Sequence, residues 1–215
     1  ENTITKLKPE AVYYFAGQSS IYKSLKNPKS TLDSNFHGAK IFLNVIHKNR
    51  LNTKFFKANS GYIFKTLKFK KNLKYQFLKP NNPYIDAQVK AFKVVEKFRR
   101  LGVNCYSLIF FNIESPLKNK SFILNKVNDF IKTKKTNFLK VGDIEVVRDF
   151  SWAPEIMKGV FYSLNLKPQN IIFASGKDFY LREMIKYFFD LKKLNIRRFI
   201  KIDKSLFRKK EKKKV

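Results

Sequence analysis

Two patterns of hydrophobic and polar residues alternate along this chain, one typical of strands and one typical of helices. Short apolar runs are typical of buried strands, and apolar residues spaced three and four apart are typical of helices packed on a sheet. Strands are predicted over residues 10–16, 54–58, 104–111, 138–150 (one strand or a pair), 170–174 and 196–202. Helices are predicted over residues 33–48, 83–100, 121–132, 154–164 and 178–191, the last with Asp178 as its N-cap. This alternation predicts an α/β fold with a parallel sheet.

Lysine dominates two segments of the chain. Residues 65–79 alternate Lys with Leu, Phe and Tyr, which predicts a basic hairpin or an extended loop. Residues 192–214 carry 12 Lys and Arg against two acids, Asp203 and Glu211, and the last eight residues are typical of a disordered basic extension. We therefore expect two parts, an α/β domain at 1–191 and a basic C-terminal extension at 192–215.

The composition excludes several classes of protein. Of the 215 residues, 44% are hydrophobic and 16% are aromatic, which is enough apolar material for a core and excludes wholesale disorder. The single cysteine, Cys105, excludes a disulfide framework and a Cys-rich zinc module. His37 and His47 have no acidic cluster near them in sequence, so we expect no metal site. No apolar run approaches the roughly 18 residues that a membrane span needs, so we expect no membrane insertion.

The charge indicates a polyanionic partner. Lys and Arg number 46 against 16 Asp and Glu, a formal charge of +30. Nucleic acid is the commonest such partner, because phosphates release counterions when Lys and Arg replace them. Drift in an AT-rich genome explains the many Lys, Asn and Phe residues but not the scarcity of acids, and a membrane surface is a weaker alternative. The residues expected to contact RNA are Lys65, Lys68, Lys70, Lys71, Lys74, Arg197, Arg198, Lys201, Lys204, Arg208, Lys209, Lys210, Lys212, Lys213 and Lys214.

Six short motifs, in a fixed order, resemble those of one enzyme family. They are Phe15-Ala-Gly-Gln-Ser-Ser with Pro28, Ala58-Asn-Ser-Gly-Tyr-Ile-Phe64, Asn82-Pro-Tyr84, Phe111-Asn-Ile-Glu-Ser-Pro116, Gly142-Asp-Ile-Glu-Val-Val-Arg-Asp-Phe150, and Ala174-Ser-Gly176 with Leu181-Arg-Glu183. Together they resemble the GDP-mannose 4,6-dehydratase group of extended short-chain dehydrogenases, the NAD-dependent epimerase/dehydratase family. The resemblance spans about residues 9 to 190 and implies a Rossmann-like parallel sheet flanked by helices.

The resemblance also implies a catalytic tyrosine, which this chain keeps without its partners. In the family a lysine four residues after the tyrosine lowers the tyrosine pKa so that it can act as a base. Tyr84 matches the tyrosine, but the fourth residue on is Gln88, and Lys90 lies two positions further, a rotation of about 200° around a helix. Ser60 matches the hydroxyl residue that polarises the sugar, and Tyr62 replaces the glutamate that promotes loss of water. We therefore expect a pseudoenzyme in which Tyr84 and Ser60 are vestigial.

The cofactor half of the family's pattern has no counterpart in these residues. The family's first strand and its Gly-x-x-Gly-x-x-Gly turn precede the Ala-Gln-Ser loop, and this chain begins only a few residues before that loop. None of its seven glycines are spaced as such a phosphate cradle. We expect a partial Rossmann-like sheet that lacks the N-terminal strands and the glycine-rich turn, with no cofactor. Asn112, Lys126 and Arg148 match positions that resemble the family's nucleotide-sugar contacts, and we expect Asn112 and Arg148 to persist mainly as structural hydrogen-bonding residues.

These observations predict a non-catalytic, basic structural protein that binds ribosomal RNA in an organellar ribosome, in particular a mitochondrial one in the matrix. Neighbouring ribosomal proteins are expected partners, one of them covering the exposed edge of the parallel sheet. Two alternatives stay open. One is a nucleotide-sugar 4,6-dehydratase or epimerase that is active only when a second chain completes it. The other is a scaffold subunit of another mitochondrial complex.

Overall fold

The computed structural model describes residues 2–69, 73–133 and 136–207, with the side chains of residues 2, 66–69, 73 and 74 excepted. The described chain forms two compact units. Unit 1 comprises residues 1–110 and 157–173, and unit 2 comprises residues 111–156 and 174–215. The boundary predicted after residue 191 does not coincide with this division.

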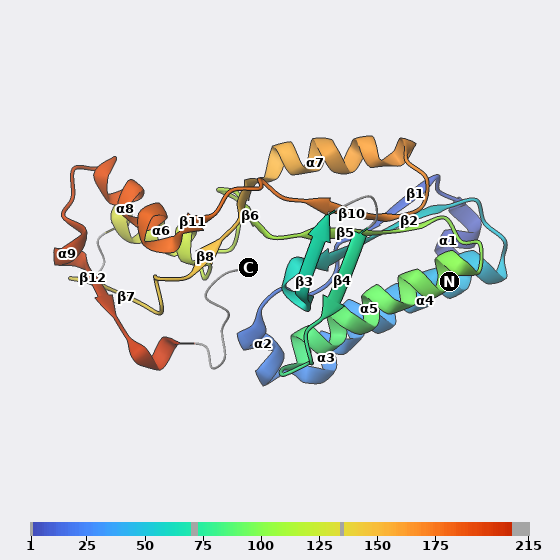
Figure 1. Ribbon diagram of the computed structural model, residues 1–215, viewed down its shortest axis with the longest axis horizontal. Helices are drawn as coiled ribbons and strands as arrows, with labels where there is room; N and C mark the ends of the chain where they lie inside the picture. The colour runs from blue at the N-terminus through green and yellow to red at the C-terminus, as the bar shows by residue number, and fades with distance from the viewer. Residues whose placement is uncertain (1, 70–72, 134–135, 208–215) are drawn as a thin grey trace. The chain divides into compact units, whose positions relative to one another are not determined.

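A parallel sheet forms the centre of unit 1 (Figure 1). Its strands are β1 (Ala11–Tyr14), β2 (Lys54–Ser60), β5 (Cys105–Phe110) and β10 (Asn170–Phe173), in the order β1-β2-β5-β10. All three neighbouring pairs are parallel, as the alternation of strands and helices predicted. The α/β, Rossmann-like class expected from the sequence is thereby confirmed.

Helices cover both faces of this sheet (Figure 1). One face is covered by α4 (Gly38–Lys48) and α5 (Pro83–Arg100), and the other by α7 (Ala153–Tyr162). The Asn82 side chain accepts the Ile85 N–H at 3.0 Å and caps α5, which has the predicted bounds. Close approach requires glycine in α7, because a Cβ at Gly159 would lie 2.8 Å from the Phe173 ring on β10.

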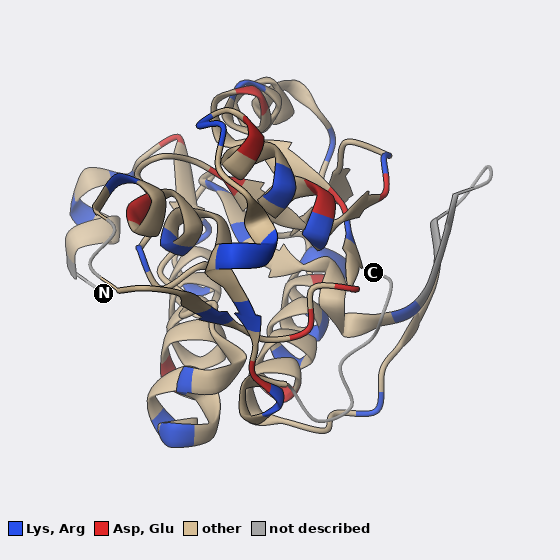
Figure 2. Cartoon of the chain, turned by 90° about the vertical axis from the view of Figure 1, so that its left-hand side faces the viewer, with Lys and Arg blue, Asp and Glu red and all other residues tan. Residues whose placement is uncertain are grey.

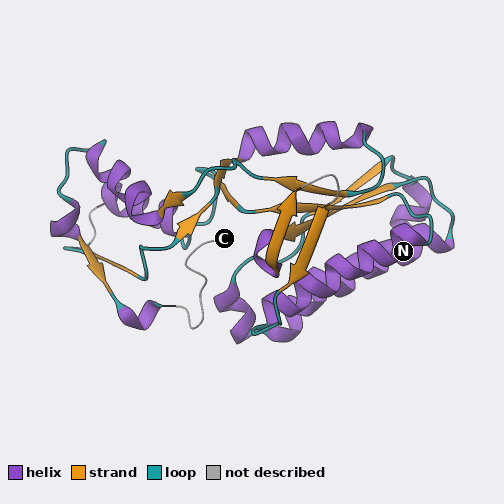
Figure 3. Cartoon of the chain, viewed as in Figure 1, coloured by secondary structure: helices purple, strands orange, loops and turns teal. Residues whose placement is uncertain are grey.

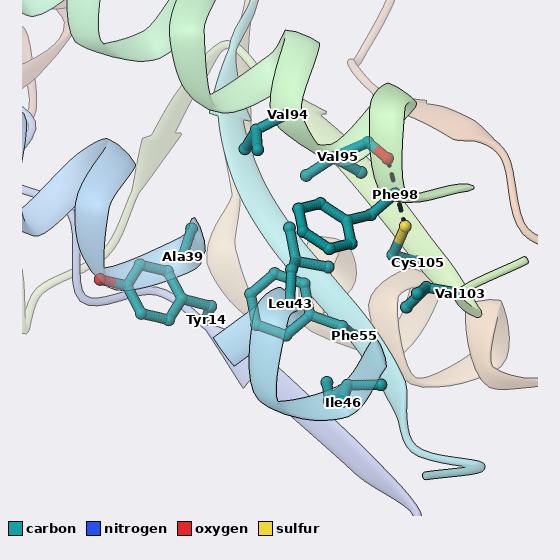
Figure 4. Packing of buried hydrophobic residues seen from close by; sticks show 10 residues of the cluster. All are labelled: Tyr14, Ala39, Leu43, Ile46, Phe55, Val94, Val95, Phe98, Val103 and Cys105. Carbon is teal, nitrogen blue, oxygen red and sulfur yellow. Dashed lines mark hydrogen bonds between the residues drawn. The ribbon is translucent and has the colours of Figure 1, made fainter. Parts of the chain in front are cut away.

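The hydrophobic core of unit 1 lies between the sheet and α4 and α5 (Figure 4). Leu43 of α4, Phe55 of β2 and Val95 of α5 are wholly buried there. Cys105 is also buried in this core and donates its thiol hydrogen to the Val95 carbonyl at 3.2 Å. The single cysteine therefore acts as a small core residue.

Several elements of unit 1 lie outside the expected strands and helices. The segment between β1 and residue 33, for which no helix was predicted, contains α2 (Ile21–Lys26) and α3 (Pro28–Leu32). A further helix, α1 (Asn2–Leu7), precedes β1. Ser20 and Asn27 cap α2 and α3. A π-helical turn, Asp33–His37, leads into α4, and the 3-10 turns Gly61–Ile63 and Ser163–Asn165 follow β2 and α7. The basic hairpin is present as β3 (Phe64–Phe69) and β4 (Leu73–Phe77), paired antiparallel.

The described part of unit 2 contains three short strand pairs and three helices (Figure 3). The pairs are β6 (Asn112–Glu114) with β9 (Phe150–Trp152), β7 (Leu139–Val141) with β12 (Ile200–Ile202), and β8 (Val147–Arg148) with β11 (Phe179–Tyr180). The helices are α6 (Ile123–Thr133), α8 (Leu181–Asp190) and α9 (Ile196–Phe199), and a 3-10 turn follows at Lys204–Leu206. Val127 and Ile185 are fully buried in its own core.

Two sequence predictions for unit 2 are wrong in detail. The last long helix begins at Leu181 with Tyr180 as its N-cap, because residues 179–180 pair with β8 instead of joining the helix that Asp178 was expected to cap. The strand predicted over 196–202 is a helical turn, α9, followed by β12. Leu194, Phe199 and Ile200 pack against the unit 2 core, so the first part of the expected extension belongs to a folded unit.

Candidate functional site

The structure brings together Ser60 and Tyr84, the two residues that match the family's catalytic positions. Ser60 ends β2, and Tyr84 lies in the first turn of α5. Tyr84 is 7% exposed, and its hydroxyl interacts with the Ser60 side chain. Burial raises the pKa of Tyr84, and the interaction with Ser60 opposes that rise. The Ser60 hydroxyl also accepts the Tyr62 backbone N–H at 3.2 Å. Tyr84 is therefore held in its protonated form.

Gln88 is part of a neutral hydrogen-bond network and provides no charge to Tyr84. Its Nε2 donates to Oδ1 of Asn35 at 2.7 Å, and Asn35 Nδ2 donates to the carbonyls of Gln18 and Thr31 at 3.0 and 3.1 Å. Lys90 lies on the exposed side of α5 in a 2.7 Å ion pair with Asp86. The helical rotation predicted for Lys90 is thus observed.

Lys57 is a buried cation that the sequence reasoning missed. It lies in β2, is 1% exposed, and its Nζ donates to the Ala58 carbonyl. Its Nζ lies 5.6 Å from the centroid of the Tyr14 ring, and its register partner on β5 is Ser107, whose hydroxyl has no partner among the described residues. Burial lowers the pKa of Lys57 to about 7. A lysine inside the apolar run Phe55-Phe-Lys-Ala58 was the available signal.

In unit 2, the three residues matched to nucleotide-sugar contacts all donate to backbone carbonyls. Asn112 Nδ2 donates to Asp149 O at 3.0 Å, Lys126 Nζ to Lys140 O at 3.0 Å, and Arg148 Nη1 to Val147 O at 2.7 Å. The Asp149 carboxylate accepts the backbone N–H groups of residues 175 and 176 at 3.0 and 2.8 Å. These contacts hold the loops of unit 2 together.

A basic stripe follows the exposed side of α5 in unit 1. Lys90, Lys93, Lys97 and Arg100 are exposed and lie on one side of the helix, because their spacing of three, four and three residues matches the helical period. Asp86 engages Lys90, whereas Lys93, Lys97 and Arg100 have no carboxylate partner among the residues that the structure describes. Lys93 Nζ also lies 5.4 Å from the Phe77 ring centroid of the hairpin. The spacing of these four cations is visible in the sequence, but the pattern was interpreted only for the core-facing side of this helix.

The sequence-predicted RNA contacts are divided between the units. Lys65 is exposed in the hairpin of unit 1. Arg197, Arg198, Lys201 and Lys204 are exposed in unit 2, where Lys201 Nζ lies 3.8 Å from the centroid of the Phe138 ring. The remaining predicted contacts lie outside the described side chains: Lys68, Lys70, Lys71, Lys74, Arg208, Lys209, Lys210, Lys212, Lys213 and Lys214.

The two units differ in charge balance; Figure 2 colours the Lys and Arg residues of the chain blue and the Asp and Glu residues red. Unit 1 holds 23 Lys and Arg against 5 Asp and Glu, a net charge of +18. Unit 2 holds 23 Lys and Arg against 11 Asp and Glu, a net charge of +12. The described residues contain no group of three or more His, Cys, Asp or Glu placed to hold a metal ion. No helix in the described part of the chain has the length and apolar character to span a bilayer.

Comparisons with known proteins agree with this geometry. The chain is 24% identical over 187 residues to GDP-mannose 4,6 dehydratase 2 of Caenorhabditis elegans, covering 84% of this chain and 49% of that protein. It is 25% identical over 210 residues to GDP-mannose 4,6 dehydratase 1 of Arabidopsis thaliana, covering 94% of this chain and 58% of that protein. The chain thus spans about half the length of the curated relatives that it matches.

Solved structures show the same fold at low sequence identity. A UDP-glucose 4-epimerase of Thermotoga maritima, solved with UDP-glucose, aligns with a TM-score of 0.83 and 17% identity, covering 99% of this chain and 69% of that chain. RMD from Pseudomonas aeruginosa, complexed with NADPH, aligns with a TM-score of 0.79 and 22% identity, covering 96% of this chain and 71% of that chain. The family profile described as GDP-mannose 4,6 dehydratase matches residues 1–215, and the chain therefore belongs to that family.

Proposed function

We propose that this protein is a non-catalytic member of its family that binds ribosomal RNA as a structural component of an organellar ribosome in the mitochondrial matrix. The observation that carries the proposal is the basic stripe of α5, where Lys93, Lys97 and Arg100 point to solvent without a carboxylate partner among the described residues. Such a row of unpaired cations is costly in isolation and is stabilised by phosphates that replace its counterions.

Each unit also has other exposed cations that we expect to contact RNA. Lys65 adds to the α5 stripe in unit 1, and Arg197, Arg198 and Lys201 provide cations in unit 2. Contacts of this kind go to the RNA backbone, so they carry affinity with little sequence preference.

The vestigial catalytic residues support a non-catalytic role. Tyr84 is buried with a raised pKa, Gln88 brings no charge, and Tyr62 replaces the carboxylate that would act as base. An ordinary phenol has a pKa of about 10 and needs a nearby cation to work as a base at neutral pH. These residues do not supply the cation that the family's pattern places beside the tyrosine, because Gln88 is neutral and its Nε2 donates to Asn35.

We also propose that a neighbouring ribosomal protein covers the open edge of the parallel sheet. β1 is a terminal strand of the parallel sheet, and its outer backbone edge pairs with no strand among the described residues. Open strand edges favour pairing with another chain. We assign this edge to a protein neighbour, since a strand or loop can satisfy its N–H and C=O groups and RNA phosphates cannot supply donors.

The experiment measures RNA affinity of the full chain across a series of salt concentrations. The variant Lys93→Gln/Lys97→Gln/Arg100→Gln should bind single-stranded RNA more weakly, and the slope of log affinity against log salt should fall by about 0.7 for each phosphate that the variant no longer neutralises. The matched control is Lys120→Gln/Arg182→Gln/Lys186→Gln, which removes the same charge from residues already paired with acids. A flat salt response of the unaltered chain, or equal weakening in both variants, contradicts the proposal.

One observation favours a second candidate function. The interaction of the Ser60 and Tyr84 side chains retains part of the family's catalytic arrangement, so a dehydratase completed by a second chain is the alternative. Native purification distinguishes the two. Co-sedimentation with ribosomal RNA supports the first function, whereas retained NAD(P) and turnover of a nucleotide sugar support the second.

A further inference from the structure

The outer face of α7 and of the turn after it is exposed and aromatic. Phe161 and Tyr162 are 65% and 67% exposed, and Met157 and Leu166 are 38% and 43% exposed. The opposite side of the helix packs against the sheet, since Val160 is 3% exposed and Gly159 lies against Phe173 of β10. The exposed rings are therefore not needed for the core of unit 1. An amphipathic helix on a sheet would normally present polar residues there.

The exposed side of α7 and of the turn after it carries two lysines and one acid, Glu155, in the first turn of the helix. Lys158 of α7 and Lys167, just after the turn, are both exposed, and neither has an ion pair with a carboxylate among the described residues. Residues 157–173 contain no Asp or Glu at all. Lys54 Nζ, from β2, donates to the Leu164 carbonyl at 2.9 Å and adds a third cation to this region.

Two aromatic rings between lysines fit one kind of ligand well. The Phe161 and Tyr162 ring centroids lie 6.2 Å apart at an interplanar angle of 62°, so the rings present differently directed faces to solvent. Unpaired nucleotides combine flat bases, which stack on aromatic rings, with phosphates that attract lysine. Bases inside an RNA duplex are stacked on one another and cannot make that contact. An apolar protein partner would leave both lysines without counter-charge.

We propose that the outer face of α7 binds unpaired RNA nucleotides, with bases stacked on Phe161 and Tyr162 and phosphates contacting Lys158 and Lys167. This inference rests on the RNA-binding function proposed above and identifies a second contact surface on unit 1. It lies on the face of the sheet opposite α4 and α5 (Figure 1). RNA would then contact both sides of the unit.

The test compares the affinity of the full chain for oligo(U) and for an RNA duplex. The variant Phe161→Ala/Tyr162→Ala should bind oligo(U) at least tenfold more weakly, because it removes both rings on which bases would stack. Affinity for the duplex and the salt slope for oligo(U) should not change, since every lysine that neutralises a phosphate is kept. The exchange Phe161→Tyr/Tyr162→Phe keeps both rings and should retain binding.

Two further variants make the result specific. Tyr187→Ala/Leu191→Ala removes side chains of similar exposure, 60% and 61%, from unit 2, and should leave oligo(U) affinity unchanged. Phe161→Leu/Tyr162→Leu keeps an apolar surface without rings and should weaken binding as much as the alanine variant does. If the leucine variant binds normally, or if the alanine variant does, the face does not stack bases and the inference fails while RNA binding by α5 stands. If the unaltered chain binds no RNA, both proposals fail.

Discussion

Unit 1 and unit 2 have the same number of Lys and Arg but use them differently. In unit 2 the acids neutralise many cations, as in the ion pairs of Lys118 with Glu114, Lys120 with Asp129, and Arg182 with Glu145. In unit 1 the described ion pairs are only those of Lys90 with Asp86 and His37 with Asp33. The number of basic residues therefore says little about where a polyanion binds. Because acids are scarce on unit 1, few of its described cations have a carboxylate partner.

The units also differ in what they bury. The core of unit 2 is built from apolar side chains, with Asp149 and Arg148 buried beside its loops. Unit 1 buries a lysine, three side-chain amides and Ser107, and the side-chain oxygens Asn59 Oδ1 and Gln88 Oε1 have no hydrogen-bond partner among the described residues. Unpaired buried polar groups cost free energy. In unit 2, Glu114 Oε2 is likewise buried without a hydrogen-bond partner among the described residues. Unit 1, which also buries Lys57, is therefore the unit with more stability to gain.

The prediction with the largest expected effect tests whether a buried polar group destabilises unit 1. Lys57→Met should raise the free energy of unfolding at pH 7 by roughly 4 kcal/mol, because the pKa of Lys57 falls from its ordinary 10.5 to about 7 on folding. Between about pH 7 and pH 10.5, the Lys57 amine is protonated in the unfolded chain and neutral in the folded chain. Stability therefore rises with pH through this window and is lowest, and constant, below about pH 7.

Urea unfolding followed by circular dichroism at neutral and alkaline pH measures this effect. The methionine variant should show a much weaker rise with pH than the unaltered chain. Lys65→Met, at an exposed position, is the control and should leave the pH dependence unchanged. An unchanged pH dependence in the Lys57 variant would show that the amine is hydrated, contrary to its burial.

A second pair of changes tests whether the units are independent. Leu43→Ala in unit 1 and Ile185→Ala in unit 2 each remove a fully buried side chain and should each cost about 3 kcal/mol in its own unit. Amide hydrogen exchange should accelerate in β1 and β2 for the first variant, and in β7 and β12 for the second. Equal acceleration throughout the chain in both variants would mean that the units unfold together.

A third change concerns the neutral network that replaces a catalytic lysine. Gln88→Ala leaves Oδ1 of Asn35 without its donor and should lower the free energy of unfolding by about 2 kcal/mol. Gln76→Ala, at an exposed position of β4, is the matched control and should cost less than about 0.5 kcal/mol. If both variants are equally stable, the Gln88 amide contributes nothing to holding α5 against the π-helical turn.

The smallest expected effect sharpens the charge comparison. Glu145→Gln frees Arg182 in unit 2 from its 2.7 Å ion pair, and RNA affinity should rise by about twofold. The gain is small because an exposed pair is worth less than about 1 kcal/mol. Fluorescence anisotropy with single-stranded RNA measures the change. A decrease in affinity would mean that the ion pair positions a contact instead of masking one.

The regularity of unit 1 made its elements predictable from the sequence. α5 has the predicted bounds because Asn82 and Pro83 mark its start and apolar residues recur at the helical period through Phe98. β5 and β10 are short apolar runs, which are typical of strands in a parallel sheet. Unit 2 was predicted less well, because its two- and three-residue strands are too short to show a period and depend on distant partners.

The chain's amino-acid order alone determined its family motifs, its charge of +30 and the alternation of strands and helices, since each depends on residue type and short-range spacing. Tertiary packing decided that Lys57 is buried, that Gln88 bonds to Asn35, and which cations have carboxylate partners. These features join residues far apart in sequence, such as Glu145 and Arg182, and no local pattern reveals them. Whether a cation is available to RNA depends on its neighbours in space.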